Sequence, residues 1–244
     1  MGESRVNLEI HPKKTALFFF RITVILVMIH IVFSTFDYIL KGKVVGFFMK
    51  FVDLDLEKSV PTLYSVFLML LCAITLWIIS KQEIRKKTGL GIYWRGISLI
   101  FFFLAIDEGT RFHESVGDLV ESLMHSNTLP VQPEGFLYWP WIIPYSVFCL
   151  AVGLIFIPFL IKLPKRSRNL FILAGAIYLA GAVMIEVISA REANLFGLNS
   201  IIYWFLYTIE EFLEMSGIVL FLYALLDYMV KETGQVLLTL KRSP

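Results

Sequence analysis

The stretch that decides how this chain folds is Asp107-Glu108-Gly109-Thr110-Arg111-Phe112-His113-Glu114. It follows the apolar run Gly96–Ile106 with no turn residue between them. A helix rises about 1.5 Å per residue, so a helix that enters a bilayer at Arg95 is only about 18 Å up at Asp107. The hydrocarbon core is about 30 Å thick. We therefore expect this charged block to lie inside the membrane, where ionisable groups usually mark a site.

The composition of the chain is that of an integral membrane protein. Of its 244 residues, 57% are hydrophobic, and the mean hydropathy is +0.74, whereas soluble domains are about 45–50% apolar. We predict a single transmembrane domain over residues 1–244. A net charge of +2 without a basic stripe excludes a nucleic-acid partner. Cys72 and Cys149 lie in apolar runs and are predicted to be buried thiols.

Six apolar segments are long enough to cross a bilayer. They cover approximately residues 15–36, 60–79, 91–115, 141–161, 170–188 and 200–230. We therefore predict an all-α, polytopic membrane protein with six transmembrane helices. Lys and Arg gather near the N-terminus, in the second and fourth connections and in the tail. This distribution favours both termini on the cytoplasmic side of the membrane.

The predicted topology places the embedded acidic residues at one depth. The third and fifth helices run outward and the sixth runs inward, so their acids fall toward the outer side. His30 and Asp37, on the outward first helix, fall in the same layer. The acids concerned are Asp107, Glu108, Glu114, Glu186, Glu210, Glu211 and Glu214.

Helical periodicity predicts which of these side chains share a face. At 100° per residue, Asp107, Arg111 and Glu114 lie on one face of the third helix, with Glu108 on its flank and His113 opposite.

On the sixth helix a single stripe holds Tyr203, Tyr207, Glu210, Glu214 and Gly217. On the fifth helix Gly175, Ala182, Glu186 and Ser189 align, and small residues let membrane helices approach closely.

The charges in this layer do not balance. Seven carboxylates face two arginines, Arg111 and Arg191. Desolvated carboxylates cannot all stay ionised side by side, so some must be protonated, or a bound cation must balance them. The alternative is that the two arginines pair with two or three of the acids and only lock the helices together.

Carboxylates with one or two histidines suit a divalent metal such as Mg, Ca, Mn, Fe(II) or Zn, the candidate cofactor here. The chain has no Glu-x-x-His for a di-iron bundle, no His-Glu-x-x-His, no P-loop and no Gly-x-Ser-x-Gly. One hypothesis is a cation- or proton-binding site, open to the outer face, in a transporter, channel or sensor. A second is a divalent-metal-dependent enzyme that acts on a lipid-like substrate. A third is a structural or sensing subunit whose charges dock a membrane partner or a second copy.

Other residues have simpler interpretations. His30 is expected to be a hydrogen-bonded interior histidine. The run Asp53-x-Asp55-x-Glu57 lacks the Gly and the terminal Glu of an EF-hand loop, so it is predicted to be a solvated face. The aromatic cluster at residues 136–141 is typical of an anchor at the membrane interface, where the chain would contact lipids.

Three motifs carry a resemblance to a known group. The first is Pro-Thr-x-x-Ser within Ser59–Ser65. The second is the Asp-Glu that ends Ala105–Glu108, followed by His113-Glu114. The third is Glu-Glu-x-Leu-Glu-Met-x-Gly at Glu210–Gly217. With these motifs the chain resembles a group of bacterial polytopic membrane proteins, from Glu57 to the end of the sixth helix. Phe212 stands where an aliphatic residue is usual. The resemblance implies a bacterial inner membrane and adds weight to the acids and His113 of these motifs, and it implies no activity.

Overall fold

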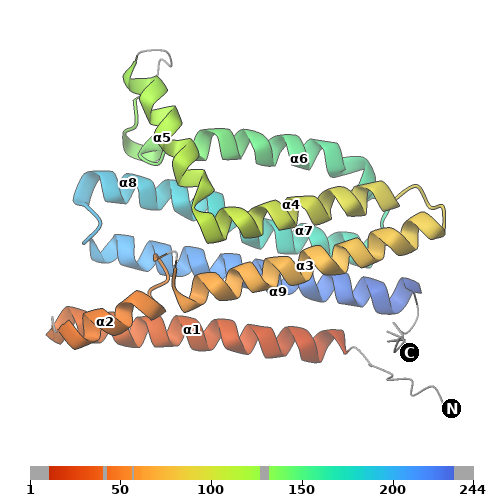
Figure 1. The fold of residues 1–244 in the computed structure, drawn as a ribbon, viewed down its shortest axis with the longest axis horizontal. Coiled ribbons are helices and arrows are strands. Elements are labelled where there is room, and N and C mark those ends of the chain that lie inside the picture. Colours follow the sequence, from red (N-terminus) through yellow and green to blue (C-terminus); the bar gives the residue numbers. More distant parts are fainter. Residues whose placement is uncertain (1–10, 41–42, 57, 127–131, 234–244) are drawn as a thin grey trace, which may run out of the picture.

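The computed structural model describes residues 11–40, 43–56, 58–126 and 132–233, and this part of the chain forms long helices without strands (Figure 1). The prediction of an all-α protein is confirmed. The helices are α1 (Pro12–Leu40), α2 (Lys43–Val52), α3 (Val60–Arg85), α4 (Gly91–Thr110), α5 (Phe112–His125), α6 (Ile142–Lys162), α7 (Lys165–Leu179), α8 (Glu186–Phe196) and α9 (Ile201–Thr233). A short 3-10 segment, η1 (Gly135–Leu137), precedes α6, and a π-helical segment, η2 (Ala180–Ile185), joins α7 to α8.

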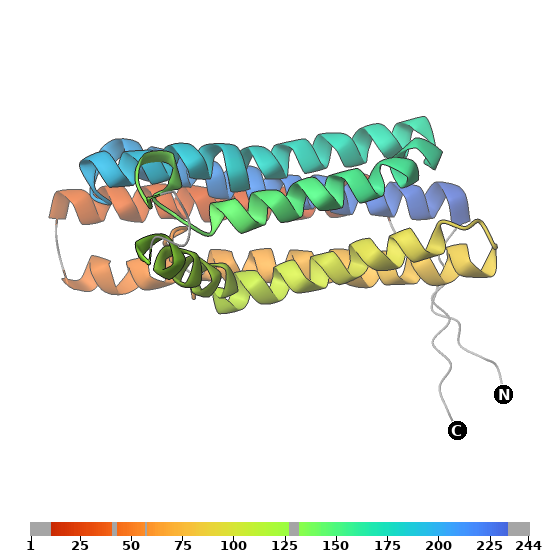
Figure 2. The same ribbon diagram turned by 90° about the horizontal axis from the view of Figure 1, so that it is seen from above.

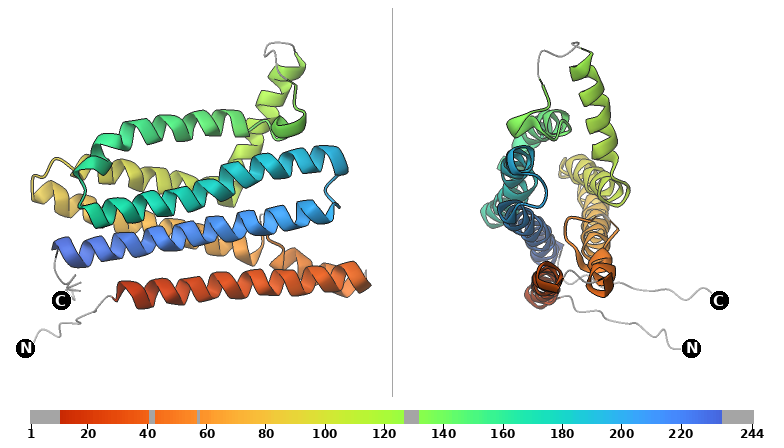
Figure 3. Two further views of the ribbon diagram at one scale, coloured as in Figure 1. Left: turned by 180° about the vertical axis from the view of Figure 1, so that it is seen from behind. Right: turned by 90° about the vertical axis from the view of Figure 1, so that its left-hand side faces the viewer.

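The long helices form two layers. Seen from above, α3 and α4 lie side by side in one layer, while α1, α6, α7–α8 and α9 form the other (Figure 2). The end-on view shows the same division, with α2 and α5 continuing the α3–α4 layer (Figure 3). The space between the layers is therefore bounded by elements that are far apart in the sequence.

The two ends of the bundle differ in charge. The α3–α4 and α6–α7 connections, the start of α1 and the end of α9 lie at one end, which we call the basic end (Figure 1). It carries Arg85, Lys86, Lys87, Lys162, Lys165, Arg166 and Lys231. The end of α1, the start of α2 and the α4–α5 and α8–α9 connections lie at the opposite, acidic end. That the basic end is cytoplasmic stays a prediction, and residues 1–10 and 234–244 lie outside the described part.

Five helical stretches of the described chain are long and apolar enough to cross a membrane, so this is a multi-pass membrane protein. They are Pro12–Ile39, Val60–Arg85, Ile142–Lys162, Lys165–Phe196 and Ile201–Glu232. The fifth predicted span, 170–188, is therefore too short, because the helix continues through η2 into α8. Helix α4 is not among the five, since its 20 residues include Arg95, Asp107 and Glu108. The sixth span thus stays a prediction.

The prediction of one continuous helix over residues 91–115 is wrong. Helix α4 ends at Thr110, and Arg111 adopts a left-handed conformation with φ 60° and ψ 36° before α5 leaves in a new direction. The Asp107 carboxylate accepts a hydrogen bond from the His113 backbone N–H at 2.8 Å and so caps the first turn of α5. This cap stabilises the break, because the first N–H groups of a helix have no partner within it.

Two glycines allow α7–η2 and α9 to lie unusually close together. A Cβ atom at Gly181 would lie 2.7 Å from the Glu210 carbonyl oxygen, and one at Gly217 would lie 2.8 Å from the Tyr178 backbone nitrogen. The predicted close approach of the fifth helix is therefore present, but at Gly181 rather than Gly175, which has no such neighbour within 4 Å. The π-helical turn shifts the helical face just before Glu186.

An aromatic core fills the basic end. The fully buried Trp94 of α4 contacts three rings, with centroid distances of 4.9 Å to Phe159, 5.7 Å to Phe171 and 4.8 Å to Tyr228. These rings come from α6, α7 and α9, so the core joins the two layers at this end. The space that the layers leave between them lies toward the acidic end.

Candidate functional site

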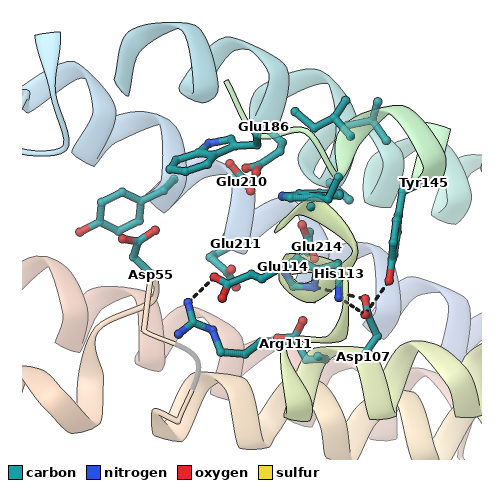
Figure 4. Close-up of a pocket in the computed structure, with 18 of the residues that line it drawn as sticks. Asp55, Asp107, Arg111, His113, Glu114, Tyr145, Glu186, Glu210, Glu211 and Glu214 are labelled. Carbon is teal, nitrogen blue, oxygen red and sulfur yellow. Dashed lines mark hydrogen bonds and ion pairs between the residues drawn. The ribbon is translucent and has the colours of Figure 1, made fainter. Parts of the chain in front are cut away.

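A cavity of about 590 Å³ lies between the two layers, toward the acidic end. Among the described residues, ten carboxylate side chains line it, against one arginine, Arg111, and one histidine, His113. The carboxylates are those of Asp55, Asp107, Glu108, Glu114, Asp118, Glu121, Glu186, Glu210, Glu211 and Glu214. All seven acids that the sequence placed in one layer are among them. Figure 4 shows the acids that it labels, Asp107, Glu114, Glu186, Glu210, Glu211 and Glu214 among them, pointing into the same space from both layers.

Glu186 and Glu210 form a pair at one side of the cavity. The Ser189 hydroxyl lies 3.4 Å from a carboxyl oxygen of each residue, so the two carboxyl groups lie beside each other. The pairing follows from the close approach at Gly181, which brings the start of α8 against α9.

Glu211 and Glu214 project from α9 one turn apart and face the α3–α4 layer. Glu108 on α4 lies close enough to act electrostatically on both of them. Neither Glu211 nor Glu214 has a hydrogen bond or an ion pair within the residues that the structure describes. Like charges from opposite layers therefore meet across this part of the cavity.

Asp107 is held by three donors and is the best-satisfied acid of the cavity. Besides the His113 backbone N–H, it interacts with His113 Nδ1 at 3.3 Å and accepts a hydrogen bond from the Tyr145 hydroxyl at 2.7 Å. The prediction that His113 lies opposite Asp107 is wrong, because it assumed a helix unbroken at Arg111. Tyr145 was not singled out from the sequence, and an isolated tyrosine in an apolar run gives no signal.

The two arginines behave differently from the prediction of a shared layer. Arg111 forms an ion pair with Glu114 at the edge of the cavity (Figure 4). Arg191 is exposed and lies outside the cavity, with its guanidinium 5.3 Å from the centre of the Phe136 ring. The Phe136 segment docks on α8, where the Gly135 N–H donates to the Asn194 side chain at 3.0 Å. The prediction that Arg191 faces the acids is therefore wrong.

His30 lies in a separate, buried site. It accepts a hydrogen bond from the Leu54 N–H at 3.3 Å, lies 3.5 Å from an Asp53 oxygen and stacks on Trp204. Its ring is fully buried, so its interpretation as a hydrogen-bonded interior histidine is confirmed. Asp37 does not line the cavity either, although it acts electrostatically on Asp53.

Asp55 of the predicted solvated run Asp53-x-Asp55 is exposed, as expected, and it also contributes to the site. The Tyr203 hydroxyl donates to Asp55 at 3.1 Å, and Asp55 lines the cavity. Tyr207, which was predicted to support the site, lines the cavity and donates to Asp53 at 3.5 Å. Burial raises the pKa of the Asp53 carboxyl above its usual value. Glu57, the third acid of this run, lies outside the described residues.

The arrangement of donors does not converge on a single ion. No three His, Cys, Asp or Glu side chains of the described chain lie together as metal ligands. The acids instead form two sets, the Glu186–Glu210 pair and the group of Glu211 and Glu214 opposite Glu108. The cavity thus offers dispersed negative charge rather than one coordination sphere.

An all-helical bundle with apolar spans around an acid-lined cavity defines a class of multi-pass membrane protein. Over residues 16–228 the sequence matches the family described as Domain of unknown function (DUF8692), and the chain belongs to that family. The matched range includes every residue that lines the cavity. No curated protein and no solved structure matches the chain.

Proposed function

We propose that the protein is a membrane transporter whose acid-lined cavity binds protons and exchanges them for a cation. The observation that carries the proposal is the charge of the cavity, in which ten carboxylates are lined up against Arg111 and His113. In a site of low dielectric constant such a set must hold protons or attract cations. The Glu186 and Glu210 carboxyl groups support the proposal, because they lie side by side at the Ser189 hydroxyl, where a proton between them would relieve the repulsion of two ionised acids.

The proposal includes the position of the cavity in the membrane. We propose that α4 crosses as well, since its 20 residues would span about 30 Å at the usual helical rise. With six spans and the basic end in the cytoplasm, the acidic end faces outward, as it would in a bacterial inner membrane. The cavity extends from Glu214, within α9, to the exposed Asp118 on α5, which gives cations a path from that side.

The two other hypotheses have less support from the geometry. A divalent-metal enzyme needs convergent ligands, and the described residues contain no group of three. A purely structural lock requires both arginines to pair with the acids of the layer, whereas the Arg191 guanidinium lies 5.3 Å from the centre of the Phe136 ring, outside the cavity. Elemental analysis of purified wild type and of Glu214→Gln tests the metal hypothesis directly.

Proton flux into vesicles tests the proposed function. The protein is reconstituted into liposomes that contain a pH-sensitive dye, and a pH gradient is imposed in the presence of Na⁺, K⁺ or an organic ammonium salt. We expect the gradient to collapse several times faster with wild type than with Glu214→Gln. The matched control is Glu232→Gln, which lies on the same helix at the basic end and outside the cavity. Equal decay for wild type, Glu214→Gln and empty liposomes contradicts the proposal.

A further inference from the structure

The cavity is much larger than a proton or a metal ion requires. Its volume of about 590 Å³ lies within the range of pockets that hold small organic molecules, roughly 300–1,000 Å³. The volume is continuous between the Glu186–Glu210 pair and the Glu211–Glu214 group, because all four side chains line it. The cavity therefore has room for a ligand that reaches both sets of acids.

Aromatic side chains accompany the acids in this space. Trp141 and Tyr145 lie with their ring centres 5.4 Å apart, and Tyr203 and Tyr207 form a second pair at 5.4 Å. The second pair continues the α9 stripe that carries Glu210, since side chains three or four residues apart share a helical face. Aromatic faces attract organic ammonium groups and do not coordinate hard metal ions.

Two of the acids that face this space have no neutralising partner in the described part of the chain. Glu211 and Glu214 are half-buried, point into the cavity and have no hydrogen bond or ion pair in the described ranges. A carboxyl group that is removed from water without a partner is costly, so a ligand that supplies N–H donors and positive charge would be stabilised here. The Glu186–Glu210 pair, which lines the same cavity, offers a second position for a cationic group.

We propose that the cavity binds an aliphatic diamine or polyamine, with one ammonium group at Glu211 and Glu214 and another at Glu186 and Glu210. The inference rests on the proposed function, because it names the chemical class of the exchanged cation. Two separated acid sets require two separated charges, which a metal ion or a monoamine lacks. The aromatic pairs contact the methylene chain and the ammonium groups between them.

Titration calorimetry on the full-length protein in detergent tests this inference. The probes are 1,4-diaminobutane, spermidine, butylamine, 1,4-butanediol, Mg²⁺ and Ca²⁺. We expect the diamine and spermidine to bind at least about tenfold more tightly than butylamine, a difference of about 1.4 kcal/mol, and the diol not to bind. Glu211→Gln and Glu214→Gln should each weaken diamine binding by a similar factor, whereas Glu232→Gln should leave it unchanged.

Wild-type measurements keep the inference falsifiable if the cavity variants fail to fold. Repeating the titration in buffers of different ionisation enthalpy counts the protons that the amine displaces. Proton release on diamine binding supports both the inference and the proposed exchange. Diamine binding without proton release supports the inference and contradicts the exchange. Proton flux in vesicles without diamine binding, or tighter binding of butylamine or Mg²⁺ than of the diamine, overturns the inference and leaves the exchange standing.

Discussion

The basic and acidic ends of the bundle differ in how many cationic partners their carboxylates have. At the basic end, Asp227 lies 2.9 Å from Arg166 and 3.1 Å from Lys231. The buried Glu83 there accepts a hydrogen bond from Thr88 at 2.7 Å and faces Lys86 at 3.6 Å. At the acidic end ten carboxylates surround one cavity with a single arginine among its lining residues in the described chain.

The difference in ion pairing goes with a difference in packing between the two ends. Acids that are paired with local cations stabilise a fixed packing, and the aromatic core around Trp94 fills the space beside them. At the acidic end the layers enclose a cavity, and Glu211 and Glu214 there have no ion pair in the described part of the chain. The basic end is thus the stable half of the bundle, and the acidic end holds the candidate site.

The largest expected effect is on the aromatic core. Trp94→Ala should lower the free energy of unfolding by about 3–5 kcal/mol, because it empties a fully buried position among three rings. Trp77→Ala serves as the control, since its side chain is 38% exposed. Thermal unfolding in detergent measures both variants. A loss for Trp94→Ala no larger than that for Trp77→Ala would remove the basis for calling the basic end the stable half.

A smaller effect is expected where the two glycines hold α7–η2 against α9. Gly217→Ala should lower the free energy of unfolding by about 1–3 kcal/mol, because its Cβ would overlap the Tyr178 backbone. Gly175→Ala is the matched control on α7, where a Cβ meets no such atom within 4 Å. The two unfolding temperatures give the comparison. If both variants unfold at the same temperature, the close approach does not position the site.

Removing a charge from the acidic end should not destabilise the protein. Glu211→Gln deletes one of several opposing like charges and removes no hydrogen bond of the described chain, so the unfolding temperature should stay unchanged or rise. Asp227→Asn at the basic end should lower the unfolding temperature, because two cations lose their partner. The comparison of the two ends fails if the two substitutions have effects of the same sign and size.

The smallest effect is a pH dependence at Asp53, beside the acidic end. Burial raises the pKa of its carboxyl in the folded protein. The protonated form is therefore the stabilising one, and its contribution is complete below the unfolded pKa of about 3.9 and lost as the pH rises through the folded value. Asp53→Asn should unfold at the same temperature as wild type in acid and at a higher temperature at neutral pH. A variant that is less stable than wild type at neutral pH would contradict this assignment.

Much of the acidic end could be predicted from the sequence. Lys and Arg gather in every second connection, which predicted the direction in which each helix crosses the membrane. A helical rise of about 1.5 Å per residue then predicted the depth of each acid. That was enough to bring Glu108, Glu186 and Glu214 together, because depth depends only on helix direction and residue count. The structure places these three side chains in one cavity.

The errors arose where contacts distant in the sequence change the local geometry. The break at Arg111 has no glycine or proline at that residue, and it depends on the Asp107 cap and the position of α6. Arg191 lies outside the cavity, where its guanidinium contacts the ring of Phe136, a residue more than fifty positions earlier in the chain. Asp55 is exposed as expected, but its place in the cavity was missed, because periodicity cannot show that the segment after α2 folds back toward Tyr203.

Infrared spectroscopy of the purified protein is the most direct test of the central claim, that the acids of the cavity share protons because the chain provides too few cations. We expect a carbonyl band of protonated carboxyl groups at neutral pH. Glu210→Gln should remove intensity from this band, whereas Glu232→Gln should leave it unchanged. A spectrum in which every carboxyl group of the protein is ionised at neutral pH would contradict the claim.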